Sequence, residues 1–181
     1  EASRISQSVD SDNLLLCGEK DGVKIEGYDL GNSPLEYSVE QVKNKTLIFN
    51  TTNGTKAIKK AVGSKNLYVG CFLNLSTIVH TLNEEQSDIV LICAGWRGRM
   101  AIEDLLFAGN VIYNLGNGTL PHEARDGSKV AFGLYEKFRE NIADLIHSSN
   151  HAERLKNIAG NSDGDKDLDY CSQRDICDIL P

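Results

Sequence analysis

The stretch Thr46-Leu47-Ile48-Phe49-Asn50-Thr51-Thr52-Asn53-Gly54-Thr55-Lys56 joins an apolar run to a polar turn that contains glycine. Residues 46–49 have the composition of a buried strand, and the apolar positions of 57–61 follow at helical spacing. The first amides of a helix lack intrahelical acceptors and lie at the positive end of the helix dipole, so this turn predicts a site for an anion such as phosphate. The alternative is that Thr52 or Asn53 only caps the helix.

The rest of the chain alternates between short apolar runs and helical patterns, which favours an α/β fold with a mainly parallel or mixed sheet flanked by helices. The length of 181 residues suits one core, so residues 1–181 are expected to form a single domain or lobe. Because the chain begins with Glu1 and not Met, we expect it to lack an N-terminal portion. The predicted strands are 14–17, 46–49, 67–69 and 89–93, and helical patterns cover 75–82, 102–109, 130–146 and 152–158.

Composition excludes several classes of function. A net charge of −7 argues against nucleic-acid binding, which needs clustered Lys and Arg. The apolar runs are too short to span a membrane. Five cysteines without a CxxC pair indicate a reducing, cytoplasmic setting and no structural zinc. The expected partner is a small anionic phosphorylated metabolite, and a homo-oligomer is left open.

Three loops follow predicted strands and are expected to meet. In open parallel sheets, ligands lie at the carboxyl ends of the strands, where residues 18–34, 51–55 and 94–103 would gather. Glu103 and Asp104 begin the helix after the third loop, and Glu19 directly follows the strand before the first. These carboxylates suit Mg²⁺, which takes oxygen ligands. The alternative is that Glu103 and Asp104 only complement the dipole of their helix.

The third loop also allows a different chemistry. Cys93 and Arg99 are separated by five residues, the spacing that cysteine-dependent phosphatases use to surround phosphate. A thiolate nucleophile there would need a lowered pKa. Ile92 and Met100 replace the His and the Ser or Thr expected beside such a pair, which favours a buried structural cysteine.

Several blocks in this order resemble the 2-phosphosulfolactate phosphatase family. The resemblance implies a Mg²⁺-dependent acid phosphatase, a phosphoric monoester hydrolase, which converts 2-phospho-3-sulfolactate to 3-sulfolactate and phosphate on a route to coenzyme M. The matching blocks are Gly18-Glu19, Gly27-Tyr28-Asp29-Leu30-Gly31-Asn32-Ser33-Pro34, Thr51-Thr52-Asn53-Gly54-Thr55, Cys93-Ala94-Gly95 with Gly98, and Glu103-Asp104 with Ala108-Gly109.

From these residues and this resemblance we expect one site. Asp104, with Glu103 or Glu19, would hold Mg²⁺ and carry the catalysis, with water as the simplest nucleophile. A noncatalytic module that captures anionic metabolites is the alternative from another class of protein. Among the four histidines, His151 is the one to test as a site residue. The expected substrate-binding residues are Asn32, Ser33, Thr52, Asn53, Gly54, Thr55, Gly95 and Arg97.

Overall fold

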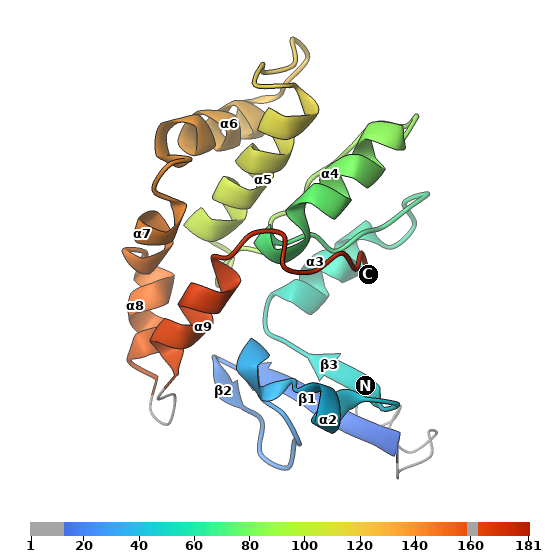
Figure 1. Ribbon diagram of the computed structural model, residues 1–181, viewed down its shortest axis with the longest axis vertical. Helices are drawn as coiled ribbons and strands as arrows, with labels where there is room; N and C mark the ends of the chain where they lie inside the picture. The colour runs from blue at the N-terminus through green and yellow to red at the C-terminus, as the bar shows by residue number, and fades with distance from the viewer. Residues whose placement is uncertain (1–12, 159–162) are drawn as a thin grey trace.

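The computed structural model describes residues 13–158 and 163–181 and shows an α/β architecture with a mixed sheet. Strand β1 (Leu14–Lys20) pairs in parallel with β3 (Thr46–Asn50) and antiparallel with the short β2 (Val23–Lys24), in the order β2-β1-β3. The sheet lies at one end of the molecule, and helices cover it and extend away from it (Figure 1). The predicted fold class and the strands at 14–17 and 46–49 are confirmed.

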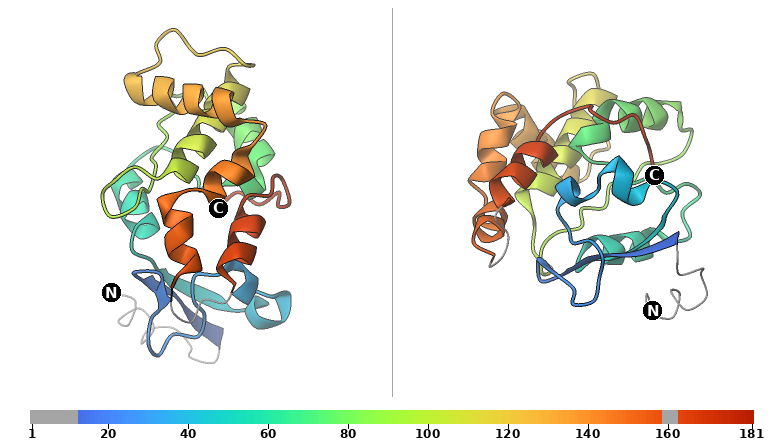
Figure 2. Two further views of the ribbon diagram at one scale, coloured as in Figure 1. Left: turned by 90° about the vertical axis from the view of Figure 1, so that its left-hand side faces the viewer. Right: turned by 60° about the horizontal axis from the view of Figure 1, so that its bottom comes forward.

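Helices occupy most of the chain after the sheet. Figure 2 shows α8 and α9 side by side, as their packing also indicates. Among the described residues, no helix combines the length and the apolar character that crossing a membrane requires. The helical elements are η2 (Pro34–Glu36), α2 (Val39–Val42), α3 (Gly54–Ala61), η3 (Phe72–Asn74), α4 (Leu75–Glu84), α5 (Ile102–Leu115), α6 (Asp126–Phe138), α7 (Ile142–His147), α8 (Asn150–Lys156) and α9 (Gly164–Cys171).

The pairing of α5 with α6 organises the helical core. Leu106 and Val111 of α5 are fully buried, because its apolar positions recur at helical spacing. A Cβ atom at Gly109 would lie 2.0 Å from the carbonyl oxygen of Ala131, so only glycine permits this close approach of the helices. One cluster consists of Phe72, Leu106, Tyr135, Ile142, Ile146, Ala152 and Leu168, and the other of Leu75, Ile78, Leu82 and Val111.

Two predicted strands, 67–69 and 89–93, are wrong. Neither segment has regular structure, and Val90 is 78% exposed. A strand requires a neighbour for its backbone hydrogen bonds, and within the described part of the chain β3 pairs with β1 alone. The amide of Val69 instead donates to the carbonyl of Pro181 at 2.9 Å.

The helical pattern of 130–146 divides into two helices. The chain turns after Phe138, where the amide of Asn141 donates to the Phe138 carbonyl at 2.8 Å, and α7 then begins. Helix α8 starts earlier than predicted, because the hydroxyl of Ser149 accepts from the amide of Ala152 at 3.0 Å and caps the helix. Helix α9 was missed, and it is anchored by the buried Leu168. Residues 1–12 and 159–162 of the predicted single domain lie outside the described residues.

Candidate active site

Glu19 joins the first predicted loop to the second. One carboxylate oxygen, Oε1, accepts from the amide of Thr52 at 2.5 Å. The other, Oε2, accepts from the Thr52 hydroxyl at 3.0 Å and from the amide of Gly22 at 2.6 Å. Backbone N–H groups that donate to a carboxylate form strong, charge-assisted hydrogen bonds. Glu19 therefore holds the Thr52 turn against the end of β1, with both of its oxygens engaged.

Asp21 and Arg97 join the first loop to the third. The guanidinium Nη2 atom of Arg97 lies 2.9 Å from Oδ1 of Asp21, and both side chains are about half exposed. The amide of Asp21 also donates to the Thr52 hydroxyl at 3.3 Å. An exposed ion pair contributes little stability, but this one brings side chains of the first and third loops into contact. All three predicted loops are thus linked by side-chain contacts.

Some of the backbone amides at the start of α3 find hydrogen-bond acceptors within their own turn. Asn53 precedes the helix but makes no capping hydrogen bond with its side chain. The hydroxyl of Thr51 accepts from the amide of Thr55 at 3.3 Å, and the carbonyl of Asn53 accepts from the amide of Lys56 at 3.0 Å. Asn53 thus occupies the N-cap position, but Thr51 and not Thr52 or Asn53 supplies the side-chain acceptor there, unlike the alternative in which one of those two caps the helix.

A tight hairpin turn places the backbone against Asp104. Trp96 and Arg99 exchange two backbone hydrogen bonds of 3.0 and 2.9 Å around Arg97 and Gly98. Gly95 has φ +66°, and a Cβ atom there would lie 2.5 Å from the carbonyl oxygen of Arg99. The amide of Gly95 donates to Oδ2 of Asp104 at 2.6 Å. The turn consequently fixes one oxygen of this carboxylate.

Only one carboxylate oxygen of Glu103 has a hydrogen-bond partner. Its Oε1 atom lies 2.6 Å from Nδ1 of His151, whereas Oε2 is buried and has no hydrogen-bond partner among the described residues. Burial tends to raise the pKa of Glu103, but the hydrogen bonds from His151 and from the backbone bring it below its usual value. Burial raises the pKa of Asp104, and the nearby charge of Glu103 adds to this effect against the opposing Gly95 hydrogen bond.

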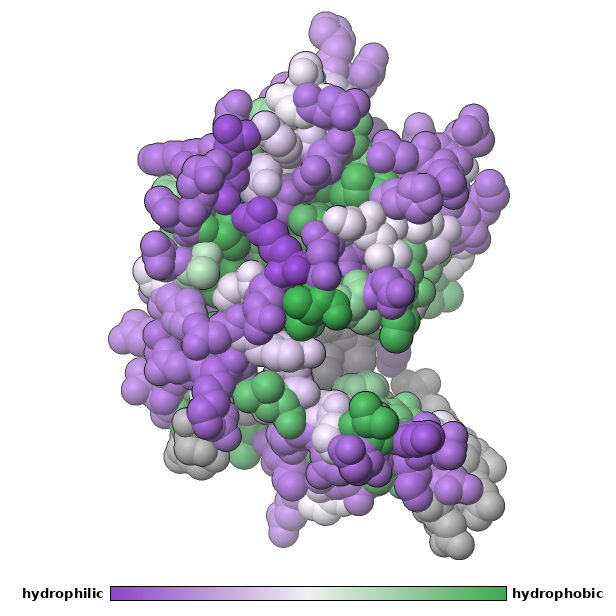
Figure 3. Space-filling view, viewed as in Figure 1, coloured by the Kyte–Doolittle hydropathy of each residue, from purple (hydrophilic) through white to green (hydrophobic). Residues whose placement is uncertain are grey.

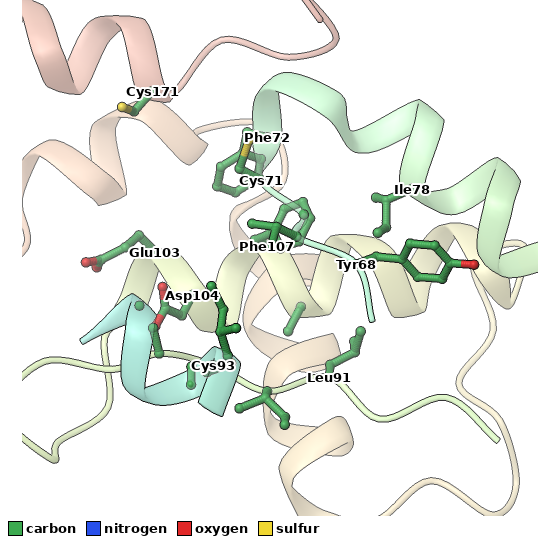
Figure 4. Close-up of a pocket in the computed structure, with 18 of the residues that line it drawn as sticks. Tyr68, Cys71, Phe72, Ile78, Leu91, Cys93, Glu103, Asp104, Phe107 and Cys171 are labelled. Atoms are coloured by element: carbon green, nitrogen blue, oxygen red, sulfur yellow. The ribbon is translucent and has the colours of Figure 1, made fainter. Parts of the chain in front are cut away.

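These carboxylates line a large cavity between the sheet and the helices. Its volume is about 1040 Å³, and apolar side chains border the hollow visible in Figure 3. Glu103 and Asp104 lie on the wall together with Phe107 and Cys93 (Figure 4). Of the predicted site residues, the wall includes Asn32, Ser33, Gly54, Glu103 and Asp104, whereas Glu19, Thr52, Asn53, Thr55, Gly95 and Arg97 lie outside it.

Ser33 approaches the cavity from the first loop. Its hydroxyl donates to Oδ1 of Asp167 in α9 at 2.5 Å. The amide of Gly31 donates to Glu36 at 2.8 Å, and the hydroxyl of Tyr37 donates to the Gly31 carbonyl at 2.7 Å. These bonds shape the Gly31–Ser33 turn, which lies near the C-terminal end of β1.

The alternative nucleophile, Cys93, also lines this cavity. Desolvation raises its pKa, and the charge of Asp104 raises it further. This shift is opposite to the one that a nucleophilic cysteine needs, because only the thiolate attacks. Cys93 is exposed and follows no strand, so the predicted buried structural cysteine is wrong, while the raised pKa does not favour a catalytic role either.

Comparison with known proteins agrees with these site motifs. A family model for 2-phosphosulpholactate phosphatase matches residues 1–181. The chain belongs to this family. A probable 2-phosphosulfolactate phosphatase of Caldanaerobacter subterraneus is 39% identical over 181 residues, which are 100% of this chain and 73% of the relative. The probable 2-phosphosulfolactate phosphatases of Clostridium beijerinckii and Thermotoga maritima are 34% and 35% identical, covering 100% and 94% of this chain and 74% and 70% of the relatives.

In this member of the 2-phosphosulfolactate phosphatase family, the site includes a cluster of aromatic and basic side chains that the sequence analysis did not predict. Trp96 stacks on His151, and Arg154 of α8 lies over the indole. These partners are more than fifty residues apart in the chain, so no local pattern connects them. The place of His151 at a predicted helix start was the only sequence signal for this cluster. Among residues 13–158 and 163–181, no group of three or more His, Cys, Asp or Glu side chains is arranged to hold a metal.

Proposed function

We propose that this member of the 2-phosphosulfolactate phosphatase family hydrolyses 2-phospho-3-sulfolactate to 3-sulfolactate and phosphate with Mg²⁺. The family match and the names of the relatives support the reaction and the substrate. The free cysteines of the described chain suit a reducing compartment, and we place the reaction in the cytoplasm on that basis.

One observation carries the metal proposal: the Oε2 atom of Glu103 is buried without a partner in the described chain, beside a second carboxylate. A buried charged oxygen is costly unless it is paired or binds a cation. Oxygen donors suit Mg²⁺, which usually takes one or two carboxylates from the protein and keeps several waters. Glu103, through its unpartnered Oε2 atom, and Asp104 would hold the ion from the cavity wall.

When bound, Mg²⁺ would neutralise charge on the phosphoryl oxygens. The chain's own residues position the substrate around it. Gly54 begins α3 on the cavity wall, where the positive end of the helix dipole favours an anionic group. Asn32 and Ser33 offer polar groups from the first loop. In this proposal Glu19 positions the Thr52 turn rather than binding the ion, and Arg97 fixes the third loop through Asp21.

The test is release of phosphate from 2-phosphosulfolactate by the full-length protein, with Mg²⁺ and after chelation. We expect activity that chelation abolishes and that added Mg²⁺ restores. Asp104→Asn should lower kcat at least about 100-fold, as expected when a group that stabilises the transition state is lost. Activity that persists without Asp104 but not without Cys93 would support the cysteine mechanism, and tight substrate binding without phosphate release would indicate a binding module.

A further inference from the structure

His151 and Trp96 form a contact that the proposed reaction does not use. His151 is the second residue of α8, and Trp96 lies in the hairpin turn before α5. Their rings stack with centroids 5.7 Å apart and an interplanar angle of 15°. The stack therefore joins the third site loop to a helix that begins about fifty residues later.

Cationic groups on neighbouring segments restrain the indole further. The guanidinium carbons of Arg97 and Arg154 lie 5.4 and 5.3 Å from its centroid, within the range of a cation–π interaction. Arg154 also donates to the backbone carbonyl of Asp21, and Arg97 pairs with the Asp21 carboxylate. The indole is thus held from the first loop, the third loop and α8 together, so the ring on which His151 rests has a fixed position.

The imidazole in turn fixes Glu103. Because an ionised carboxylate only accepts hydrogen bonds, Nδ1 of His151 carries the proton and donates to Oε1. Glu103 and Asp104 are adjacent in sequence and repel each other when both are ionised. The contact between Nδ1 of His151 and Oε1 holds the Glu103 side chain against this repulsion. With it, Oε2 stays buried at the cavity wall beside the second carboxylate.

We propose that His151, seated on Trp96, is a positioning residue that orients Glu103 so that its Oε2 atom ligates the divalent cation. This inference rests on the proposed function, because it assigns a role toward the ion held by Glu103 and Asp104. Hydrogen-bond partners of metal ligands commonly change metal affinity by about 10- to 100-fold when they are removed.

The experiment titrates the full-length protein, stripped of metal, with Mn²⁺ and measures free Mn²⁺ by electron paramagnetic resonance. The 181 residues contain one tryptophan, Trp96, and the difference in emission between the wild type and Trp96→Phe follows the same titration at the cluster itself. His151→Ala should weaken Mn²⁺ binding about 10- to 100-fold. His151→Asn, whose amide nitrogen occupies nearly the place of Nδ1, should restore most of the affinity.

A matched control separates positioning from general destabilisation. His147 is 25% exposed, close to the 30% of His151, and its ring pairs with Asp165 and Asp169 away from Glu103. His147→Ala should leave the Mn²⁺ affinity unchanged. Equal Mn²⁺ affinity of the wild type and His151→Ala would overturn the positioning role alone. Absence of Mn²⁺ binding by the wild type would overturn the proposed metal site, and the positioning role with it.

Discussion

Nδ1 of His151 lies 2.6 Å from Oε1 of Glu103, although the two residues are 48 positions apart in the chain. This contact brings α8 against the first turn of α5, where Asp104 follows Glu103. It leaves one oxygen of Glu103 buried without a partner in the described structure. The candidate site therefore consists of two adjacent carboxylates, of which Glu103 is held by His151 and Asp104 by backbone amides of Gly95 and Ala94.

Glu103→Gln should lower stability at neutral pH in the metal-free protein. The folded-state pKa of Glu103 lies below its ordinary value, so its ionised form stabilises the fold. That contribution is complete above the ordinary pKa of 4.5 and is lost as the pH falls through the lower folded-state pKa. Denaturant unfolding should show a difference of about 1–2 kcal/mol at pH 7 that shrinks under acid. A difference that is constant with pH would contradict this origin.

Asp104→Asn should have the opposite effect on stability. Burial raises the folded-state pKa of Asp104, so its ionised form costs stability at neutral pH. The cost is absent below the ordinary pKa of 3.8 and complete above the raised folded-state value. Asparagine keeps an oxygen for the Gly95 amide, so the melting temperature of the metal-free variant should rise at pH 7 while phosphatase activity falls. A variant that melts lower at pH 7 would contradict the account.

Cys93→Ser should retain activity within about twofold, because the raised pKa of Cys93 leaves little thiolate at neutral pH. Alkylation of Cys93 by iodoacetamide, followed by peptide mass spectrometry, should be slow at pH 7 and should accelerate as the pH rises. Cys171 serves as a reference within the same molecule, because burial raises its pKa to about 11. Rapid alkylation of Cys93 at pH 7 with loss of activity would favour the cysteine mechanism.

Gly95→Ala should disrupt the turn that supports Asp104. The added Cβ would lie 2.5 Å from the Arg99 carbonyl oxygen, and φ is +66°. Gly98→Ala is the matched control, since Gly98 has φ +74° but a Cβ atom added there would meet no other atom within 4 Å. Both variants should lose about 1–2 kcal/mol to backbone strain, and Gly95→Ala should lose more and reduce activity further. Equal effects on stability and kcat would show that the close approach to Arg99 is unimportant.

The sequence predicted the elements that depend on local patterns. The β-branched and aliphatic runs at 14–17 and 46–49 pair with each other, and the periodicity of 102–109 forms the buried face of α5. The strand predictions at 67–69 and 89–93 were wrong. An apolar run becomes a strand only where a neighbouring strand accepts and donates its backbone hydrogen bonds, and no pattern in the run itself reveals that neighbour.

For the site, too, the sequence indicated residues with a local pattern but not contacts between distant segments. Glu103 and Asp104 stand out because acids open an amphipathic helix after a glycine-containing turn. The engagement of Glu19 with Thr52 and Gly22 was not predictable, since it depends on how two loops meet in space. The stack of Trp96 on His151 depends on the packing of α8 and carries no spacing signal.

The most direct test of the central claim measures phosphate release from 2-phosphosulfolactate by the full-length protein and its Asp104→Asn variant, each with Mg²⁺ and after thorough chelation. The account predicts that only the wild type with Mg²⁺ releases phosphate at an appreciable rate. Undiminished phosphate release by the chelated wild type, or by the variant, would contradict a metal-assisted site at Glu103 and Asp104.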